Sequence, residues 1–203
     1  MTDPRILPHV VGGDISLTAS ALAWPDRHTE VVGATGLANP RIYAGERAGL
    51  LGALAARLDD AAHSRNTLYV GRPRLVVLED FPTTGHFDPE RGYLWWRFVE
   101  QLAADSVPVL PVPPGTLKLY ACGMGNANKR EVIAGVQEFF PDWPIMKTGK
   151  RGNVLTTVDD NKADAVVLMA IGCALLGEPI AEVPAKHQKA LDKLELPPGV
   201  RRA

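Results

Sequence analysis

Cysteine is scarce in this sequence, and its scarcity limits the kinds of protein that the chain can be. Among 203 residues there are two cysteines, Cys122 and Cys173, and their spacing suits neither a disulfide framework nor a metal-binding pair. We therefore expect both thiols to be small buried side chains in a protein of a reducing, cytosolic compartment.

Excess charge and long apolar segments are also missing. The formal net charge is −1, so the chain as a whole does not attract nucleic acid, although a local basic patch would be enough to bind it. Residues 1–9 are polar, unlike the basic and then apolar start of a signal segment. The longest apolar run that could form a helix, residues 163–176, is too short to span a bilayer. We expect a cytoplasmic protein with no membrane partner.

The chain does contain enough apolar material for one sizeable folded domain. Hydrophobic residues make up 46% and charged residues 22% of the sequence, as in ordinary globular proteins. We expect an N-terminal extension over residues 1–8, a single folded domain over residues 9–177, and a C-terminal helix and polar tail over residues 178–203.

Hydrophobic periodicity predicts an α/β domain with a mixed central sheet. The opening residues 9–24 alternate as strands with one buried face do, and further strand patterns cover residues 30–35, 74–80 and 107–112, the last continued by residues 117–122. Helical patterns cover residues 43–62, 92–105, 128–140, 160–176 and 185–194. A basic, glycine-punctuated loop is expected over residues 147–153. The first three strands should pair antiparallel, and the helices should cover both faces of the sheet.

Four acidic residues occupy positions that suggest a functional role. Asp14 lies inside the first predicted strand, where Asp is rare and costly to bury alone. Glu79 ends an apolar strand at the edge of the sheet. Asp160 and Asp164 are four residues apart at the start of an apolar helix and therefore share one face.

Each of these residues also has a plainer interpretation. Asp14 could be a turn residue, and Glu79 or its neighbour Asp80 could be a solvent-facing strand end. Asp159 or Asp160 could serve only as an N-cap, because helix starts favour Asp. Taken together, converging carboxylates would repel one another, and two Mg²⁺ or Mn²⁺ ions roughly 4 Å apart would neutralise them and clamp an in-line phosphoryl displacement.

Three segments carry a resemblance to a known superfamily. GGDISLTASALAW at residues 12–24, LVVLED at residues 75–80 and DDNKADA at residues 159–165 resemble the RNase H-like superfamily. YACGMGNANKREV at residues 120–132 is similar to the stretch before a helix in RuvC-type Holliday junction resolvases. Order and spacing match the phage and other virus-associated branch better than the bacterial enzyme. The resemblance covers about residues 9–177 and implies an RNase H-like nuclease domain there.

The resemblance implies a site and an activity. Asp14, Glu79 and Asp164 would be metal ligands, and Lys129 would lie near the scissile phosphate. The family places an acid or His three residues before the last Asp, where this chain has Asn161. We favour Asp160 as the fourth ligand and keep Asn161 and Asp159 as alternatives. The implied protein is a homodimeric endodeoxyribonuclease of a bacterial or phage-infected cell, with two Mg²⁺ or Mn²⁺ ions per site, that cuts Holliday junctions or other branched DNA.

Basic and aromatic residues suggest where DNA would bind. The basic candidates lie between the third strand group and the last long helix, and they are Lys118, Lys129, Arg130, Lys147, Lys150 and Arg151. Phe87, in the loop after Glu79, could wedge between bases as an aromatic does in resolvases, whereas Phe81 is expected in the core. His86 in the same loop is a weaker candidate for a general base. Trp96 lies off the buried stripe of its helix and could contact a second subunit.

Three other functions compete with a resolvase. Another RNase H-like nuclease, cutting RNA–DNA hybrids or flaps, would share the fold and the metal site. A non-catalytic nucleic-acid-binding protein on this fold would be expected to have lost the carboxylates, which are present. A sugar-kinase or actin-like ATPase would need a second lobe and glycine-rich phosphate loops, for which 203 residues leave no room.

Overall fold

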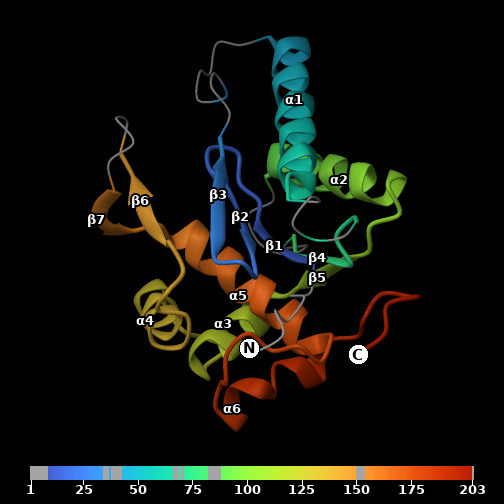
Figure 1. The fold of residues 1–203 in the computed structure, drawn as a ribbon. Coiled ribbons are helices and arrows are strands. Elements are labelled where there is room, and N and C mark those ends of the chain that lie inside the picture. The colour runs from blue at the N-terminus through green and yellow to red at the C-terminus, as the bar shows by residue number, and fades with distance from the viewer. Residues whose placement is uncertain are drawn as a thin grey trace.

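The computed structural model describes residues 9–33, 37, 43–65, 69, 71–81, 88–149 and 154–202. They form a five-stranded sheet with helices on both faces, and a two-stranded hairpin stands apart from the sheet (Figure 1). Within these residues, no helix is long and apolar enough to cross a membrane. The expected N-terminal extension lies outside the described residues, as do Phe87, His86, Lys150 and Arg151.

The sheet is mixed, and its strands lie in the order β3-β2-β1-β4-β5. Their bounds are β1 Val10–Asp14, β2 Ser20–Trp24, β3 His28–Val32, β4 Leu75–Glu79 and β5 Val109–Val112. β2 pairs antiparallel with both β1 and β3, whereas β4 pairs parallel with both β1 and β5. β1 therefore lies at the centre of the sheet, between one antiparallel and one parallel neighbour.

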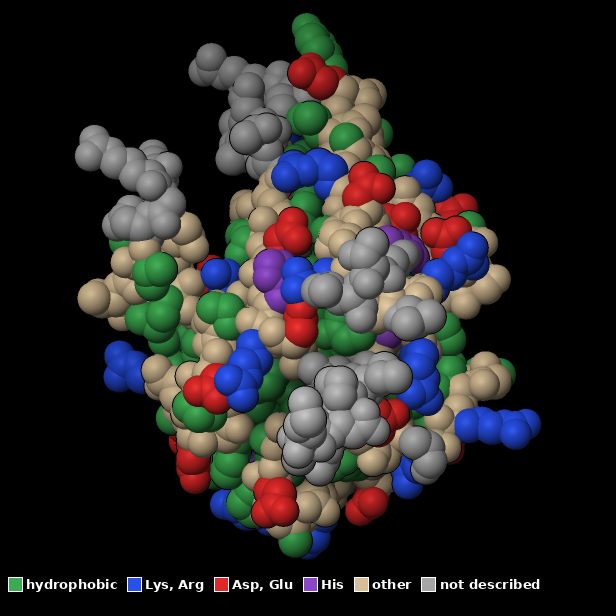
Figure 2. All heavy atoms as spheres, in the orientation of Figure 1, with side chains coloured by type: hydrophobic (Ala, Val, Ile, Leu, Met, Phe, Trp, Pro, Cys, Tyr) green, Lys and Arg blue, Asp and Glu red, His purple; other side chains and the backbone are tan. Residues whose placement is uncertain are grey.

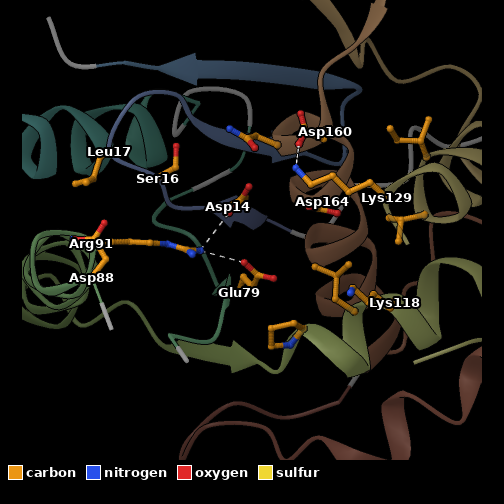
Figure 3. Close-up of a pocket in the computed structure, with 15 residues that line it drawn as sticks. Asp14, Ser16, Leu17, Glu79, Asp88, Arg91, Lys118, Lys129, Asp160 and Asp164 are labelled. Carbon is orange, nitrogen blue, oxygen red and sulfur yellow. Dashed lines mark hydrogen bonds and ion pairs between the residues drawn. The ribbon is translucent and has the colours of Figure 1, made fainter. Parts of the chain in front are cut away.

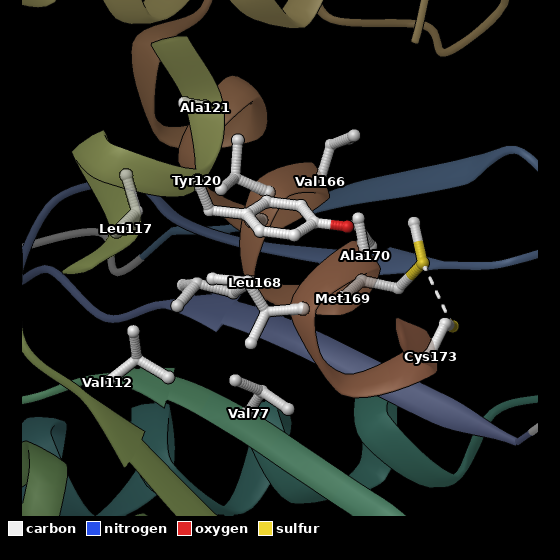
Figure 4. Packing of buried hydrophobic residues seen from close by; sticks show 14 of the residues in the cluster. Val77, Val112, Leu117, Tyr120, Ala121, Val166, Leu168, Met169, Ala170 and Cys173 are labelled. Carbon is white, nitrogen blue, oxygen red and sulfur yellow. Dashed lines mark hydrogen bonds between the residues drawn. The ribbon is translucent and has the colours of Figure 1, made fainter. Parts of the chain in front are cut away.

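Helix α5, Asp160–Leu175, covers one face of the sheet and is buried on nearly every side. It packs on β1, β2 and β4, and α3 (Pro114–Cys122) and α4 (Lys129–Phe139) pack around it. Figure 4 shows Tyr120 of α3 lying against α5, in one apolar cluster with Leu168 of α5 and Val77 of β4. This layer holds the start of α5 close to the ends of the central strands.

Helices α1, Ala44–His63, and α2, Pro89–Ala104, cover the opposite face. Leu54 and Leu58 of α1 and Leu94 and Phe98 of α2 form a second apolar cluster with the other sides of β1 and β4. Because both faces are covered, β1 and β2 are buried along their whole length. The prediction that the opening strands have only one buried face is therefore wrong.

Three predicted elements differ from the observed ones. Residues 117–122 do not extend a strand but belong to α3, which has a proline in its first turn and ends at Gly123 with a positive φ of 75°. The predicted basic loop includes strand β6, Met146–Thr148, which pairs with β7, Val154–Val158. The last predicted helix is broken into α6, Ala185–Gln188, and a 3₁₀ turn, Leu191–Lys193.

The single residues that were assigned to the core or the surface mostly follow the predictions. Phe81 is buried, and Trp96 is 64% exposed. Cys173 is buried, but Cys122 is only half-buried at the end of α3, so the prediction holds for one thiol and not the other. On the face shown in Figure 2, blue basic and red acidic side chains are interspersed among the described residues.

Gly12 allows α5 to lie directly on β1. A Cβ atom at Gly12 would lie 2.2 Å from the backbone oxygen of Ala165 and 2.3 Å from the backbone nitrogen of Met169. Real side chains never approach this closely, so the glycine sets the separation between β1 and α5. Since Asp14 ends β1 and Asp164 precedes Ala165 by one residue, this contact also sets how close the two carboxylates come.

Gly12→Ala is expected to lower the free energy of unfolding by about 3 kcal/mol, because the methyl group must push α5 off the sheet. Urea titration followed by circular dichroism would measure the loss. The matched control is Gly49→Ala on the exposed side of α1, where an added Cβ meets nothing within 4 Å. That change should be stabilising by up to about 1 kcal/mol. Equal effects of the two substitutions would contradict the close packing at Gly12.

Candidate functional site

The ends of two neighbouring parallel strands and the start of α5 meet at one edge of the sheet. Gly13 of β1 is paired with Leu78 of β4, so the next residues, Asp14 and Glu79, end their strands side by side. Asp160 begins α5, and Asp164 follows one turn later. Figure 3 shows the four carboxylates around a common space.

This space is a cavity of about 500 Å³. All four carboxylates line it, together with three basic side chains, Arg91 of α2, Lys118 of α3 and Lys129 of α4. The other residues that line the cavity are Ser16, Leu17, Asp88, Pro114, Leu117, Val132, Ile133 and Asn161. The walls therefore come from both helical layers and from the sheet edge between them.

Burial and mutual repulsion make two of the carboxylates hard to ionise. Asp14 is 7% exposed, and burial, reinforced by the charge of Glu79, raises its pKa to about 7 despite the opposing charge of Arg91. Burial, reinforced by Asp14 and Glu79, raises the pKa of Asp164 to about 8. The cavity thus concentrates negative charge that the protein itself compensates only in part.

Arg91 compensates the charge between the two strand ends. Its Nη2 lies 3.1 Å from Oε2 of Glu79 and 3.8 Å from Oδ1 of Asp14, and its Nε donates to the backbone oxygen of Ile15 at 2.9 Å. The first turn of α2 is fixed by its N-cap, Asp88, whose side chain accepts from the backbone N–H groups of residues 90 and 91. The guanidinium is therefore held at the cavity wall from three sides.

Lys129 compensates the charge at the start of α5. Its Nζ donates to Oδ2 of Asp160, and this hydrogen bond is the main reason why the pKa of Asp160 is lowered. Lys129 is the first residue of α4, which opens with a capping box between Asn128 and Glu131. The lysine is otherwise largely exposed and reaches the cavity from its rim.

Comparison with solved structures identifies the fold of this chain. No family model and no curated protein sequence matches the chain. Solved structures do match. Thermus thermophilus RuvC has a TM-score of 0.54 at 21% identity, over 85% of this chain and 98% of that one. T. thermophilus RuvC in complex with a Holliday junction substrate has a TM-score of 0.54 at 22% identity, over 85% and 97%. The yeast mitochondrial Holliday junction resolvase Ydc2 has a TM-score of 0.51 at 12% identity, over 94% and 86%.

This chain has the RuvC-like fold. This likeness in fold agrees with the RNase H-like fold that the sequence motifs predict. The four acidic residues proposed from the sequence all line one cavity in this fold, and so do Lys118 and Lys129.

The structure places the three candidates for the fourth ligand differently. Asp159 is the N-cap of α5, where its side chain accepts from the backbone N–H of Lys162, and it does not line the cavity. Asn161 lines the cavity, but its amide nitrogen donates to the backbone oxygen of Ala19 at 2.6 Å. Asp160 is the candidate whose carboxylate is directed to the cavity, where it meets Lys129.

Two further basic candidates among the described residues lie outside the cavity wall. Arg130 is exposed on the first turn of α4. Lys147 is exposed on β6, close enough to Asp160 to contribute to lowering its pKa. Neither residue lines the cavity, so each can act only on a ligand that extends beyond it.

Arg91 was missed by sequence reasoning. The only signal was its place in the first turn of α2, where a basic side chain faces the positive end of the helix dipole and is unfavourable. A basic residue at this unfavourable position indicates a compensating ion pair. The partners of Arg91 are Glu79 and Asp14.

The donor chemistry of the cavity suits divalent cations. The four candidate carboxylates offer only hard oxygen ligands, as Mg²⁺ and Mn²⁺ prefer. Burial and then neighbouring negative charge raise the pKa values of Asp14 and Asp164, and a bound cation would neutralise that charge. No three of these carboxylates have oxygens within 4.8 Å of one another. Among the described residues only Asp59, His63 and Asp105 form such a group, at the ends of α1 and α2 and outside the cavity.

Proposed function

We propose that this protein is a structure-selective endodeoxyribonuclease that hydrolyses phosphodiesters in four-way or other branched DNA, using two divalent cations, Mg²⁺ or Mn²⁺, per site. The observation that carries the proposal is the set of four carboxylates lining one cavity of a RuvC-like fold. Two structures with this fold point to the substrate: one is described in complex with a Holliday junction substrate and another is named as a Holliday junction resolvase.

Asp14, Glu79, Asp160 and Asp164 would hold the cations. Bound divalent cations supply Lewis acidity for the in-line displacement at phosphorus. The protein contributes the geometry, because Asp14 and Glu79 are fixed by strand pairing and Asp160 and Asp164 by one helix. Hydrolysis by this route needs no nucleophile from the protein.

The basic residues around the cavity would bind the DNA backbone. Lys118 and Lys129 line the cavity, and Arg130 and Lys147 lie beyond it on α4 and β6. Because the formal net charge of the chain is −1, attraction to DNA depends on this local group. We propose the same role for Lys150 and Arg151, and a base-wedging role for Phe87.

A homodimer would present two such sites to a four-way junction. Trp96 is 64% exposed on α2, where its ring stands edge-on against Trp95 with the centroids 4.9 Å apart, and Tyr93 is 44% exposed on the same helix. An exposed Trp and Tyr on one helix suit a subunit contact. Two-fold symmetry would match two cleavage sites on opposite strands.

Cleavage assays test the proposed function directly. A four-way junction, a duplex of the same sequence, a flap and an RNA–DNA hybrid would be incubated with the protein in Mg²⁺, in Mn²⁺ or in chelator. We expect the junction to be cut much faster than the other substrates, and only when a divalent cation is present. Faster cutting of the hybrid or the flap would assign the protein to another nuclease activity of the same fold.

Lys129→Ala is expected to weaken junction binding and to reduce the slope of log K against log salt concentration by about one unit, because one phosphate contact is lost. Fluorescence anisotropy in chelator, over a series of salt concentrations, would measure the slope without cleavage. Lys189→Ala, at an exposed lysine that does not line the cavity, is the control and should leave the slope unchanged. Equal slopes for wild type and Lys129→Ala would remove Lys129 from the contact surface.

A further inference from the structure

Arg91 places a positive charge at the point where the cavity needs a cation. Its guanidinium lies between Asp14 and Glu79, 3.8 Å from an oxygen of the first and 3.1 Å from an oxygen of the second (Figure 3). These two carboxylates end adjacent strands of the sheet, so they cannot move apart to relieve their repulsion. The arginine therefore acts as the counter-ion of a rigid acidic pair.

The arginine is fixed in this position by the surrounding fold. Its Nε donates to the backbone oxygen of Ile15, one residue beyond β1. Helix α2 is tied to the end of β4 by a hydrogen bond from Nε1 of Trp95 to the backbone oxygen of Glu79. Arg91 is thus a part of the cavity wall, in contrast to Arg97 on the same helix, which pairs at the surface with Glu100.

A divalent cation and this guanidinium would compete for the same oxygens. A cation coordinated by Asp14 and Glu79 would lie within a few ångströms of Arg91, and like charges at that distance repel strongly inside a protein. Cation binding therefore requires the arginine to release its two partners.

We propose that Arg91 is the internal counter-ion of the metal-free site and sets the divalent-cation concentration at which the site is filled. It holds Asp14 and Glu79 in place before a cation arrives and must leave them when one binds. Among the described residues Asp164 has no ion-pair partner, and Asp160 pairs with Lys129, so Arg91 controls the strand side of the cavity. This inference rests on the proposed function, because it takes Asp14 and Glu79 to be cation ligands.

Calorimetric titration of the full-length protein with Mn²⁺ tests the inference without any cleavage reaction. Arg91→Gln should bind Mn²⁺ at least about tenfold more tightly than wild type, because the competing charge is gone while a polar, uncharged side chain remains. Arg97→Gln removes the same charge from the surface of the same helix and should change the affinity by less than about twofold. Unchanged or weaker binding by Arg91→Gln would overturn the inference.

Arg91→Lys provides a second test that does not depend on how well the Gln variant folds. An ammonium keeps the charge but cannot donate to Ile15 and reach both carboxylates as a guanidinium fork does. Its Mn²⁺ affinity should therefore lie between those of wild type and Arg91→Gln. If neither variant binds more tightly than wild type, Arg91 does not compete with the cation.

A readout without metal separates this inference from the proposed function. In chelator, Arg91→Gln should unfold at a lower temperature than Arg97→Gln, since Asp14 and Glu79 lose their counter-ion, and Mn²⁺ should restore more of that stability. If Mn²⁺ binding responds to Arg91 as expected but no DNA is cut, the inference stands and the nuclease assignment fails. If DNA is cut and Arg91→Gln leaves Mn²⁺ affinity unchanged, only the inference fails.

Discussion

Asp14→Asn is expected to reduce cleavage of a four-way junction by about a hundredfold or more while leaving the affinity for the junction nearly unchanged. The substitution replaces a proposed ligand, the most buried of the four carboxylates, and keeps the size of the side chain. No basic residue at the cavity rim is altered, so contacts with phosphates are retained. Single-turnover cleavage in Mg²⁺ and anisotropy in chelator would measure the two quantities separately.

The fold should tolerate this change, which makes the loss of activity interpretable. Burial raises the pKa of Asp14, so the charged form of this side chain destabilises the folded state. A neutral amide at the same position removes that destabilisation. The melting temperature of Asp14→Asn in chelator at pH 8 should therefore be at least that of wild type. Asp142→Asn, at an exposed aspartate paired with Arg27, is the control and should cut at the wild-type rate.

Two outcomes would contradict the assignment of Asp14. Cleavage at the wild-type rate would show that Asp14 is not a ligand. A large loss of junction affinity, together with a large loss of rate, would instead indicate that Asp14 organises the DNA-binding surface. In either case the four-carboxylate site would have to be redefined around Glu79, Asp160 and Asp164.

The sequence predicted that the four carboxylates converge, but it placed Asp14 inside its strand, whereas the structure places it at the strand end. Asp14 and Glu79 each end an apolar strand, and the ends of adjacent parallel strands lie at the same edge of a sheet. Asp160 and Asp164 are one helical turn apart, so they share a face wherever the helix lies. Gly12 allows α5 to pack closely on β1, but the need for a glycine at this position is evident only from the structure.

Elements whose structure depends on distant partners were not predictable in the same way. Residues 117–122 have a strand-like composition, but burial of Leu117 and Tyr120 against α5 favours a helix there. Strand β7 is almost wholly exposed, so it lacks the alternation that marks a half-buried strand, and its pairing with β6 decides its conformation.

Arg91 was missed for the same reason. Its role depends on how α2 is placed against β1 and β4, and the apolar stripe of α2 indicates only which side of the helix is buried. The structure therefore brings the four predicted carboxylates to one cavity, but that cavity also holds positive charge that the sequence did not indicate. Arg91 and Lys129, which come from helices on opposite faces of the sheet, already occupy part of it.

Without divalent cations, the protein is expected to lose stability as the pH rises from about 4 to about 8. The pKa of Asp14 is raised from 3.8 to about 7, mainly by burial, and that of Asp164 from 3.8 to about 8. Over this range the folded state holds protons that the unfolded state has released, so folding becomes less favourable at each step. The total loss should be on the order of a few kcal/mol, since each unit of pKa shift corresponds to about 1.4 kcal/mol.

Thermal unfolding in chelator and in saturating Mn²⁺, at intervals of half a pH unit, would measure this effect. The two curves should be close near pH 4, where protonated carboxylates bind cations poorly, and should diverge as the pH approaches 8. Taking their difference removes groups that do not respond to Mn²⁺. One such group is His9, whose pKa is lowered by burial and whose contribution therefore has the opposite sign.

Asp164→Asn identifies the origin of the pH dependence. This variant lacks the group with the higher of the two raised pKa values, and it also relieves Asp14 of one neighbouring charge. Its melting temperature in chelator should fall less between pH 6 and pH 8 than that of wild type, and Mn²⁺ should raise it less at pH 8. If wild type in chelator is equally stable at pH 5 and pH 8, the cavity does not hold the uncompensated negative charge that a metal-dependent nuclease requires.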